Sequence, residues 1–468
     1  MKSSLKCIIL VSWFLGLLSA CGSSNSTPVN NAPVAAWISG SDTIDQAGTY
    51  GTPGLAAPSN VPGARQRAVS WPDSSGKLWL FGGTGLDSTG TIGHLNDLWK
   101  YDPATLEWTW VSGEYTVTRT GIYGTKGAAD LSNVPGGRDA AVSWLDSSGQ
   151  LWLFGGHGHD SAGTIGHLND LWRYDPATLE WTWMSGSDTV YQAGTYGTKG
   201  TASSSNVPGG RNAAISWRDS SGKLWLLGGY GNDSAGTIGH LNDLWKFDPA
   251  TLEWTWVSGN NTVNQKGTYG TKGTAASANV PGAREAAVSW RDSSGKLWLL
   301  GGYGNDSAGT IGHLNDLWKF DPATLEWTWV SGSNTVNKAG GYGTQLTAAS
   351  ANVPGAREAA VSWCDSNGKL WLFGGYGYNS AGTIGHLNDL WKFDPATLEW
   401  TWMSGSNTVN QAGTYGTLGT AAASNVPGAR ETAVSWLDSS GRLWLFGGWG
   451  YDSAHNPGYL NDLWQYMK

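Results

Sequence analysis

The sequence predicts an all-β fold, a six-bladed β-propeller in which every blade is a four-stranded antiparallel sheet. A Pro-Gly-Ala/Gly-Arg turn recurs at a fixed spacing of 73 residues, as from Arg65 to Arg138 (138 − 65), and a fixed period indicates a repeat architecture. A Leu-Trp-Leu-Phe/Leu-Gly-Gly segment follows each turn, and the two ends of the chain hold complementary parts of one copy. The arginine of the turn occurs six times, at Arg65, Arg138, Arg211, Arg284, Arg357 and Arg430.

The composition agrees with many short strands joined by tight turns. Of 468 residues, 69 are Gly and 31 are Trp, and only 14% are charged. Disordered chains are poor in aromatic residues and rich in charge, so disorder is not expected. The net charge of −8 is spread thinly and no basic run occurs, so nucleic acid is not an expected partner.

Each copy contains four strand candidates, here called a to d in chain order. In the first copy, Asp73-Ser74-Ser75-Gly76 forms the turn between a and b, and Asp102-Pro103-Ala104-Thr105 forms the turn between c and d. Proline suits a turn because it presets φ and lacks the N–H that a strand ladder needs. Longer loops join b to c and d to the next copy. The expected strands are Arg65–Trp71, Lys77–Phe81, Asn96–Tyr101 and Glu107–Ser112.

Apolar residues on both faces of strand b predict how the sheets pack. Leu78 and Leu80 lie on one face, while Trp79 and Phe81 lie on the other, because side chains alternate along a strand. A lone four-stranded sheet cannot bury both faces, but a sheet between two like itself can. Radial packing of such sheets makes a propeller, typically of four to eight blades, and six copies predict six blades. The recurring tryptophans are expected to form the core.

The chain ends predict that the ring is closed. The last copy stops after strand c, at residues 460–468, and lacks strand d. Residues 35–40, Ala-Ala-Trp-Ile-Ser-Gly, match the strand d segment at residues 108–113. We expect the N-terminal strand to complete the sixth blade, which distinguishes a closed ring from an open solenoid.

The repeated residues resemble the kelch repeat. The Gly-Gly doublet after strand b, the Asn-Asp-Leu-Trp-Lys-Tyr-Asp-Pro segment on strand c and the tryptophan of strand d carry the resemblance, which covers residues 34–468. The same repeat builds the central propeller of galactose oxidase, so the resemblance implies a propeller. The copies here are longer than the usual kelch repeat of about 50 residues, and most of the excess lies between strands d and a.

The N-terminus has the pattern of a bacterial lipoprotein. Residues 1–20 form a signal peptide candidate with a short basic region and an apolar run too short to span a membrane. The ending resembles a lipobox, which implies that Cys21 is lipidated; an ordinary secretory signal is the alternative. Residues 21–33 read as a flexible tether, followed by the propeller at 34–468. The residue after the cysteine is Gly22. Aspartate at that position is associated with retention in the inner membrane, so a glycine there favours the outer membrane.

Two interpretations are open for the six arginines. Strand a should be innermost, so these side chains could ring one mouth of the central channel and bind an anionic ligand. Alternatively, they pair with carboxylates of neighbouring blades.

Residues that differ between copies are the candidates for a specific ligand site. Two positions carry different side chains in different copies: one directly follows the Gly-Gly doublet, and the other lies two residues further along the chain. Both are expected on the face that the d–a and b–c loops share. Aromatic rings beside amides suit sugar faces or protein surfaces, although packing of the loops is the alternative. The predicted ligand-binding residues are His157, His159, Tyr230, Tyr303, Tyr376, Tyr378, Trp449 and Tyr451.

No metal site and no cofactor are expected. A histidine precedes strand c in five copies, but equivalent positions on different blades are far apart unless they line the axis. We expect these histidines to anchor loops by hydrogen bonds. The five are His94, His167, His240, His313 and His386.

Enzymatic activity is not expected, and no catalytic residues are assigned. The chain lacks a Gly-x-Ser-x-Gly elbow, a His-Glu-x-x-His motif and a phosphate-binding loop. The copper site of galactose oxidase does not carry over, because Cys364 is expected at an a–b turn on the opposite face. The expected function is a lipid-anchored, monomeric, non-catalytic propeller that binds a surface glycan or protein. The alternative is a sugar-modifying enzyme, similar to kelch propellers that interconvert sialic acid anomers.

Overall fold

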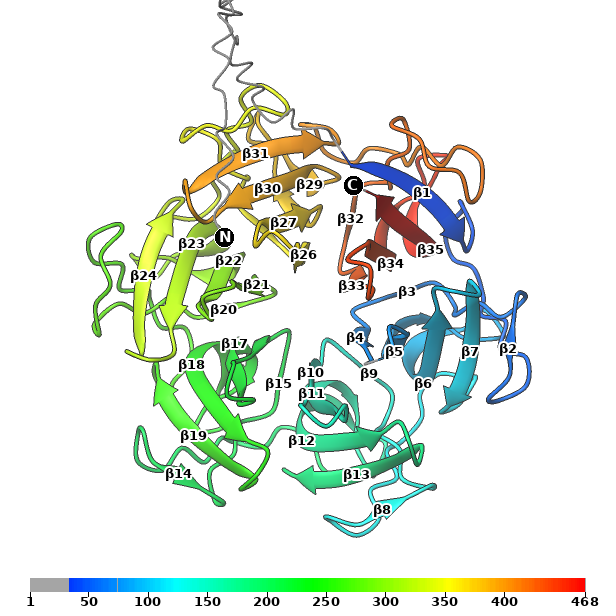
Figure 1. Cartoon of the computed structure of the whole chain (residues 1–468). Coiled ribbons are helices and arrows are strands. Elements are labelled where there is room, and N and C mark those ends of the chain that lie inside the picture. The colour runs from blue at the N-terminus through cyan, green and yellow to red at the C-terminus, as the bar shows by residue number, and fades with distance from the viewer. Residues whose placement is uncertain (1–32, 74, 468) are drawn as a thin grey trace, which may run out of the picture.

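The computed structural model describes residues 33–73 and 75–467. It is a ring of six blades around a central opening (Figure 1). In each blade the sheet runs antiparallel from strand a at the axis to strand d at the periphery. The six-bladed propeller and its 73-residue repeat are therefore confirmed.

Blades 1 to 3 each carry one further short strand outside strand d, contributed by the preceding d–a loop. In blade 1 the strands are β2 (Ala56–Ala57), β3 (Arg65–Gln66), β4 (Val69–Pro72), β5 (Leu78–Leu86), β6 (Ile92–Asp102) and β7 (Glu107–Ser112). In blade 2 they are β8 (Ala129–Asp130), β9 (Arg138–Asp139), β10 (Val142–Leu145), β11 (Leu151–His159), β12 (Ile165–Asp175) and β13 (Glu180–Ser185). In blade 3 they are β14 (Ala202–Ser203), β15 (Arg211–Asn212), β16 (Ile215–Arg218), β17 (Leu224–Asn232), β18 (Ile238–Asp248) and β19 (Glu253–Ser258).

Blades 4 to 6 repeat the pattern, with strands b and c interrupted in blade 5. Blade 4 has β20 (Arg284–Glu285), β21 (Val288–Arg291), β22 (Leu297–Asn305), β23 (Ile311–Asp321) and β24 (Glu326–Ser331). Blade 5 has β25 (Arg357–Glu358), β26 (Val361–Cys364), β27 (Leu370–Phe373), β28 (Tyr376–Tyr378), β29 (Ile384–His386), β30 (Leu390–Asp394) and β31 (Glu399–Ser404). Blade 6 has β32 (Arg430–Glu431), β33 (Val434–Leu437), β34 (Leu443–Tyr451), β35 (Pro457–Met467) and, at its outer edge, β1 (Val34–Ser39).

The strand bounds differ from the sequence expectation in two ways. Strand a is split in every blade, as into β3 and β4, because the residue after β3, Arg67, adopts a positive φ of 54°. Strands b and c extend well past the Gly-Gly doublet, so the positions expected in the b–c loop lie on paired strands. The remaining b–c connection is a tight turn at residues 87–91.

A ring of backbone hydrogen bonds joins the blades around the axis. In each blade, the residue with positive φ donates its N–H to the carbonyl of the equivalent residue in the preceding blade, at 2.8 to 3.0 Å. The bond from Arg67 to Thr432 joins blade 1 to blade 6 and completes the ring. The six residues are Arg67, Ala140, Ala213, Ala286, Ala359 and Thr432, with φ between 49° and 55°.

The N-terminal strand closes the sixth blade, as predicted. β1 pairs antiparallel with β35, placing Trp37 opposite Trp464. In Figure 1 this joins the blue start of the propeller to its red end. The amide of Asn425 also donates to the carbonyl of Ala35, at 3.1 Å, so the d–a loop before blade 6 holds the closing strand in place.

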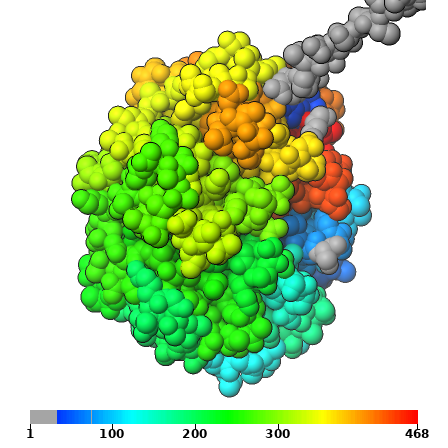
Figure 2. Space-filling model, turned by 60° about the vertical axis from the view of Figure 1, so that its left-hand side comes forward, coloured from blue at the N-terminus to red at the C-terminus, as the bar shows by residue number. Residues whose placement is uncertain are grey.

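The hydrophobic core lies between adjacent blades. Trp79 and Phe81 of blade 1 pack in one cluster with Leu151, Trp172 and Trp181 of blade 2. Comparable clusters fill the other five junctions. The prediction that each sheet buries both faces against its neighbours is confirmed, and Figure 2 shows the successive blades as one continuous outer surface.

The repeated arginines do not ring the channel mouth, so that interpretation is wrong. Arg65 is 1% exposed and forms a bidentate pair with Asp97 of its own blade, with both N···O distances 2.7 Å. The other carboxylate contacts come from Tyr50 and Trp99, which each donate to Asp97 Oδ2 at 2.7 Å. Burial alone would lower the pKa of the Arg65 guanidinium, but Asp97 outweighs burial and raises it.

The same buried pair occurs in all six blades. The remaining pairs are Arg138–Asp170, Arg211–Asp243, Arg284–Asp316, Arg357–Asp389 and Arg430–Asp462. The partner carboxylate thus belongs to the same blade, and not to a neighbouring blade as the alternative interpretation held. These charges satisfy each other inside the blade and are not available to a ligand.

The Gly-Gly doublet permits the close approach of neighbouring blades. Gly82 has a φ of 64°, and a Cβ there would lie 2.8 Å from the carbonyl oxygen of Arg138 in blade 2. Its own carbonyl accepts from Arg65 Nη1 at 3.0 Å. The doublet therefore accepts a hydrogen bond from the arginine of the buried pair and also lets the neighbouring blade approach closely.

Within residues 33–73 and 75–467, no helix is long and apolar enough to cross a membrane. The predicted signal peptide, Cys21 and almost all of the tether lie outside the described residues.

Deletion of residues 34–40 should lower the Tm by at least about 5 °C, because blade 6 loses its outer strand and its inter-blade contacts. Differential scanning calorimetry measures this. The Leu131→Ser variant is the control, because Leu131 is 76% exposed and its loss should leave the Tm unchanged. An unchanged Tm after the deletion would contradict closure by β1.

The Asp243→Asn variant should reduce the free energy of unfolding by about 3–5 kcal/mol, because it leaves the Arg211 guanidinium buried and without a counter-ion. Denaturant unfolding followed by tryptophan fluorescence gives the value. The matched control is Asp248→Asn, which breaks the half-exposed pair with Lys223 and should change stability by at most about 1 kcal/mol. Equal effects of the two substitutions would refute a special role for the buried pair.

Candidate functional site

A cavity of about 380 Å³ lies at the axis of the ring. Small residues of the hydrogen-bonded ring, such as Ala286 and Ala359, form its wall. Its charged lining consists of three glutamates and Arg67, and Tyr303 adds an aromatic ring. The three glutamates are Glu285, Glu358 and Glu431. Because carboxylates outnumber the arginine, the cavity is acidic.

One row of paired residues in each blade lies next to the hydrogen-bonded ring, and we call the six rows the channel tier. Four residues of the tier, Glu285, Tyr303, Glu358 and Glu431, line the cavity. Each row contains the residue that follows the buried arginine, its partner on strand b and the next partner on strand c. The rows are Gln66/Thr84/His94, Asp139/His157/His167, Asn212/Tyr230/His240, Glu285/Tyr303/His313, Glu358/Tyr376/His386 and Glu431/Trp449/Tyr459.

The strand c histidine of each of the first five rows contacts the following blade. His240 Nε2 lies 3.3 Å from Glu285 Oε1, and His313 Nε2 lies 3.3 Å from Glu358 Oε1. Rings also meet across the junctions, as between His240 and Tyr303, whose centroids are 5.6 Å apart. These histidines hold the d–a loops by hydrogen bonds, as expected, but through their backbone: the N–H of Asn264, for example, donates to the carbonyl of His240 at 2.7 Å. Their rings link neighbouring blades.

The structure brings five of the predicted ligand-binding residues into the channel tier. All five are half-buried: His157, Tyr230, Tyr303, Tyr376 and Trp449. Their common position on strand b explains why they gather around the axis.

The second predicted row has a different role. His159 is 3% exposed, and its Nδ1 contacts the carbonyl of Gly163 in the b–c turn at 3.3 Å. The equivalent Asn232 donates to Gly236 in the same way, at 3.1 Å. The expectation that His159 faces a ligand is wrong, because the second row packs the turn; Tyr378 and Tyr451 are half-buried there.

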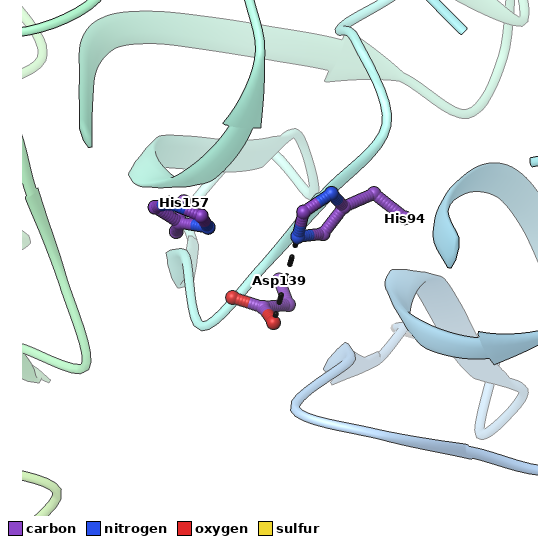
Figure 3. A group of neighbouring side chains, drawn as sticks. All are labelled: His94, Asp139 and His157. Atoms are coloured by element: carbon purple, nitrogen blue, oxygen red, sulfur yellow. Dashed lines mark ion pairs between the residues drawn. The ribbon is translucent and has the colours of Figure 1, made fainter. Parts of the chain in front are cut away.

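One junction of the channel tier is chemically distinct. Between blades 1 and 2, His94, Asp139 and His157 each offer a ligand atom, and these atoms lie within 4.8 Å of one another (Figure 3). His94 Nε2 is 3.9 Å from Asp139 Oδ2. The ring centroids of His94 and His157 are 5.4 Å apart. Thr84 Oγ1 donates to Asp139 Oδ2 at 2.6 Å.

Burial favours the neutral form of His94. It lowers the pKa of His94; Asp139 opposes the shift, whereas His157 and His159 add to it. The pKa of the neighbouring His167 falls to about 4, chiefly through burial and then through His157. Neutral imidazoles retain a free lone pair, which is the form that binds a metal.

Sequence reasoning missed this grouping because it compared only equivalent positions on different blades. His94 and His157 occupy different strands of adjacent blades, and their proximity depends on how the blades pack. One signal in the sequence was available: Asp139, His157 and His159 all depart from the residues of the other copies. Blade 1 departs at the same three positions, with Gln66, Thr84 and Leu86, so the departures distinguish blades 1 and 2 from the other four.

Comparison with known proteins supports the fold. The family model of the KLHDC2/KLHL20/DRC7 Kelch-repeats domain matches residues 53–267. A solved structure, described as the structure of YjhT, is 16% identical over 86% of this chain and 95% of its own, with a TM-score of 0.50. No curated protein matches the chain. The repeat, the closed ring and the structural match together show a six-bladed β-propeller, in which residues 53–267 are similar to kelch repeats.

Proposed function

We propose that this protein is a lipid-anchored, non-catalytic kelch propeller that binds a glycan or protein ligand through the d–a/b–c face. The channel tier at the axial cavity is the proposed binding site. A neutral sugar or an amino sugar suits it best. The observation that carries the proposal is a cavity of about 380 Å³ whose lining combines the half-buried ring of Tyr303 with three glutamates.

The chemistry of the tier matches what a sugar requires. The apolar face of a pyranose packs against an aromatic ring, while its hydroxyls need acceptors and donors nearby. Tyr303 lines the cavity together with Glu285 and Glu358, so a ring and two acceptors border the same space. Ligand pockets commonly measure about 300–1,000 Å³, and the cavity falls within that range.

Two observations weigh against the alternative, an enzyme acting on a sialic acid. Three glutamates and one arginine line the cavity, and an acidic lining repels a sugar carboxylate. The six repeated arginines, which could have bound that carboxylate, are committed to buried aspartates. A neutral or cationic sugar meets neither obstacle.

Attachment to the membrane is part of the proposal. It depends on residues 1–33, where Cys21 would carry the lipid, and on Gly22, which favours the outer membrane of a bacterial envelope. We propose a monomer, because β1 of the same chain supplies the missing strand of blade 6 and no second chain is needed to complete the ring. Metabolic labelling with a fatty-acid analogue, and its loss in the Cys21→Ser variant, tests the lipid anchor.

The Tyr303→Thr variant should weaken glycan binding at least about tenfold, or about 1.4 kcal/mol, because it removes a ring that borders the cavity. Blade 1 carries threonine at the equivalent position, Thr84, so the scaffold accepts this substitution. A glycan screen identifies the ligand, and isothermal titration calorimetry then compares the variants.

The control is Leu252→Asn, on a c–d turn of the opposite face. Leu252 is 42% exposed with a φ of 60°, a conformation that asparagine adopts readily, so binding should be unchanged. Chemical conversion of a sugar by the purified protein would replace the proposal with the enzymatic alternative. If the Tyr303→Thr and Leu252→Asn variants bind the glycan equally tightly, the binding site does not lie at the channel tier.

A further inference from the structure

The junction between blades 1 and 2 stands out because the copies are otherwise nearly identical. At the tier position after the arginine, blade 2 has Asp139, where the other blades have Gln, Asn or Glu. On strand b it has His157, where the others have Thr, Tyr or Trp, and His159, where the others have Leu, Asn or Tyr. These three substitutions meet His94, so the differences gather at one point of the fold.

The geometry at this point is close to that of a metal centre. The three ligand atoms lie within 4.8 Å of one another. A tetrahedral zinc ion with bonds of about 2.0–2.1 Å holds its ligand atoms about 3.3 Å apart. The separation of His94 Nε2 from Asp139 Oδ2, 3.9 Å, therefore needs only a small side-chain movement.

The Asp139 carboxylate is buried and incompletely satisfied. Asp139 is 7% exposed, and its Oδ1 has no hydrogen-bond partner among the described residues. Its Oδ2 receives the Thr84 hydroxyl, which would orient the carboxylate as outer hydrogen bonds do around bound metals. Leaving a buried carboxylate oxygen unpaired is costly, and a cation between Asp139 and the two histidines would remove that cost.

We propose that His94, Asp139 and His157 bind a divalent transition-metal ion, with Zn²⁺ as the expected class. Two imidazoles and one carboxylate are ligands that suit zinc and its neighbours, and no thiolate is needed. Three protein ligands leave a coordination position for water or for a ligand atom. The His94 and His157 side chains are half-buried, so this position can face the axial channel. The proposal is independent of glycan binding.

Neighbouring side chains support the ligands from behind. The ring of His159 contacts the ring of His94, with centroids 5.6 Å apart, and His157 contacts His167 at 5.6 Å. Because these rings lie on paired strands, they restrict how the ligand imidazoles can turn. The equivalent junction between blades 3 and 4 has a glutamate and a tyrosine, Glu285 and Tyr303, and cannot supply the second imidazole.

The test is metal binding by the full chain, purified without a polyhistidine tag and freed of metal with a chelator. Isothermal titration calorimetry with ZnCl₂ should show one ion bound per chain. Co²⁺ should produce visible absorption bands from the same site. Absence of binding by both ions would overturn the proposal.

Two variants test the ligands, and each installs the residue of blade 3. The His157→Tyr and Asp139→Asn substitutions reproduce Tyr230 and Asn212, so the fold already accommodates them. Each should weaken Zn²⁺ binding by at least about 100-fold while thermal melting confirms folding. The control is His313→Tyr, since blade 6 has Tyr459 at that position; it should bind zinc as the wild type does. Wild-type affinity in either ligand variant would refute the assignment.

A gain of function provides an independent check. The double substitution Glu285→Asp and Tyr303→His builds the same ligand set beside His240 at the junction of blades 3 and 4. The variant should bind two zinc ions per chain. A stoichiometry of one in the folded variant would count against the proposal that these three side chains suffice.

Discussion

The buried pair between arginine and aspartate is the interaction on which each blade depends. Arg65 binds Asp97 with two hydrogen bonds and also donates to the carbonyls of Gly63 and Gly82. It thereby joins the turn before strand a, the middle of strand b and the middle of strand c. Because a buried ion pair is costly unless every polar atom is satisfied, the surrounding donors are as necessary as the pair itself.

The same pair also organises the long d–a connections. Tyr50, in the connection that precedes strand a, donates to Asp97, and its ring contacts Trp99 at 4.8 Å. Each d–a connection is thus held against strand c of the following blade. The extra length of this repeat is consequently ordered structure, and in three blades it adds a strand outside strand d.

Variation between the copies is placed where it does not disturb this network. The positions of the buried pair are the same in all six blades, while the next residue toward the axis is Gln, Asp, Asn or Glu. Side chains at the channel tier contact one another across the blade junctions, and four of them line the cavity. They can therefore change without exposing a buried charge. A repeated scaffold can acquire a unique site in this way, because the altered residues of one blade act together with a repeated residue, His94, of the blade beside it.

The sequence by itself determined the number of blades, the antiparallel strands and the closure by residues 34–39. These features follow from a fixed period, from alternating apolar residues and from the missing strand d of the last copy, all of which are local or repetitive signals. It did not place the arginines correctly, because the direction of Arg65 depends on the break in strand a at Arg67. Only the tertiary structure decided which side chains meet across a junction. His94 and Asp139 are brought together by the offset between packed blades, a quantity that no spacing along the chain specifies.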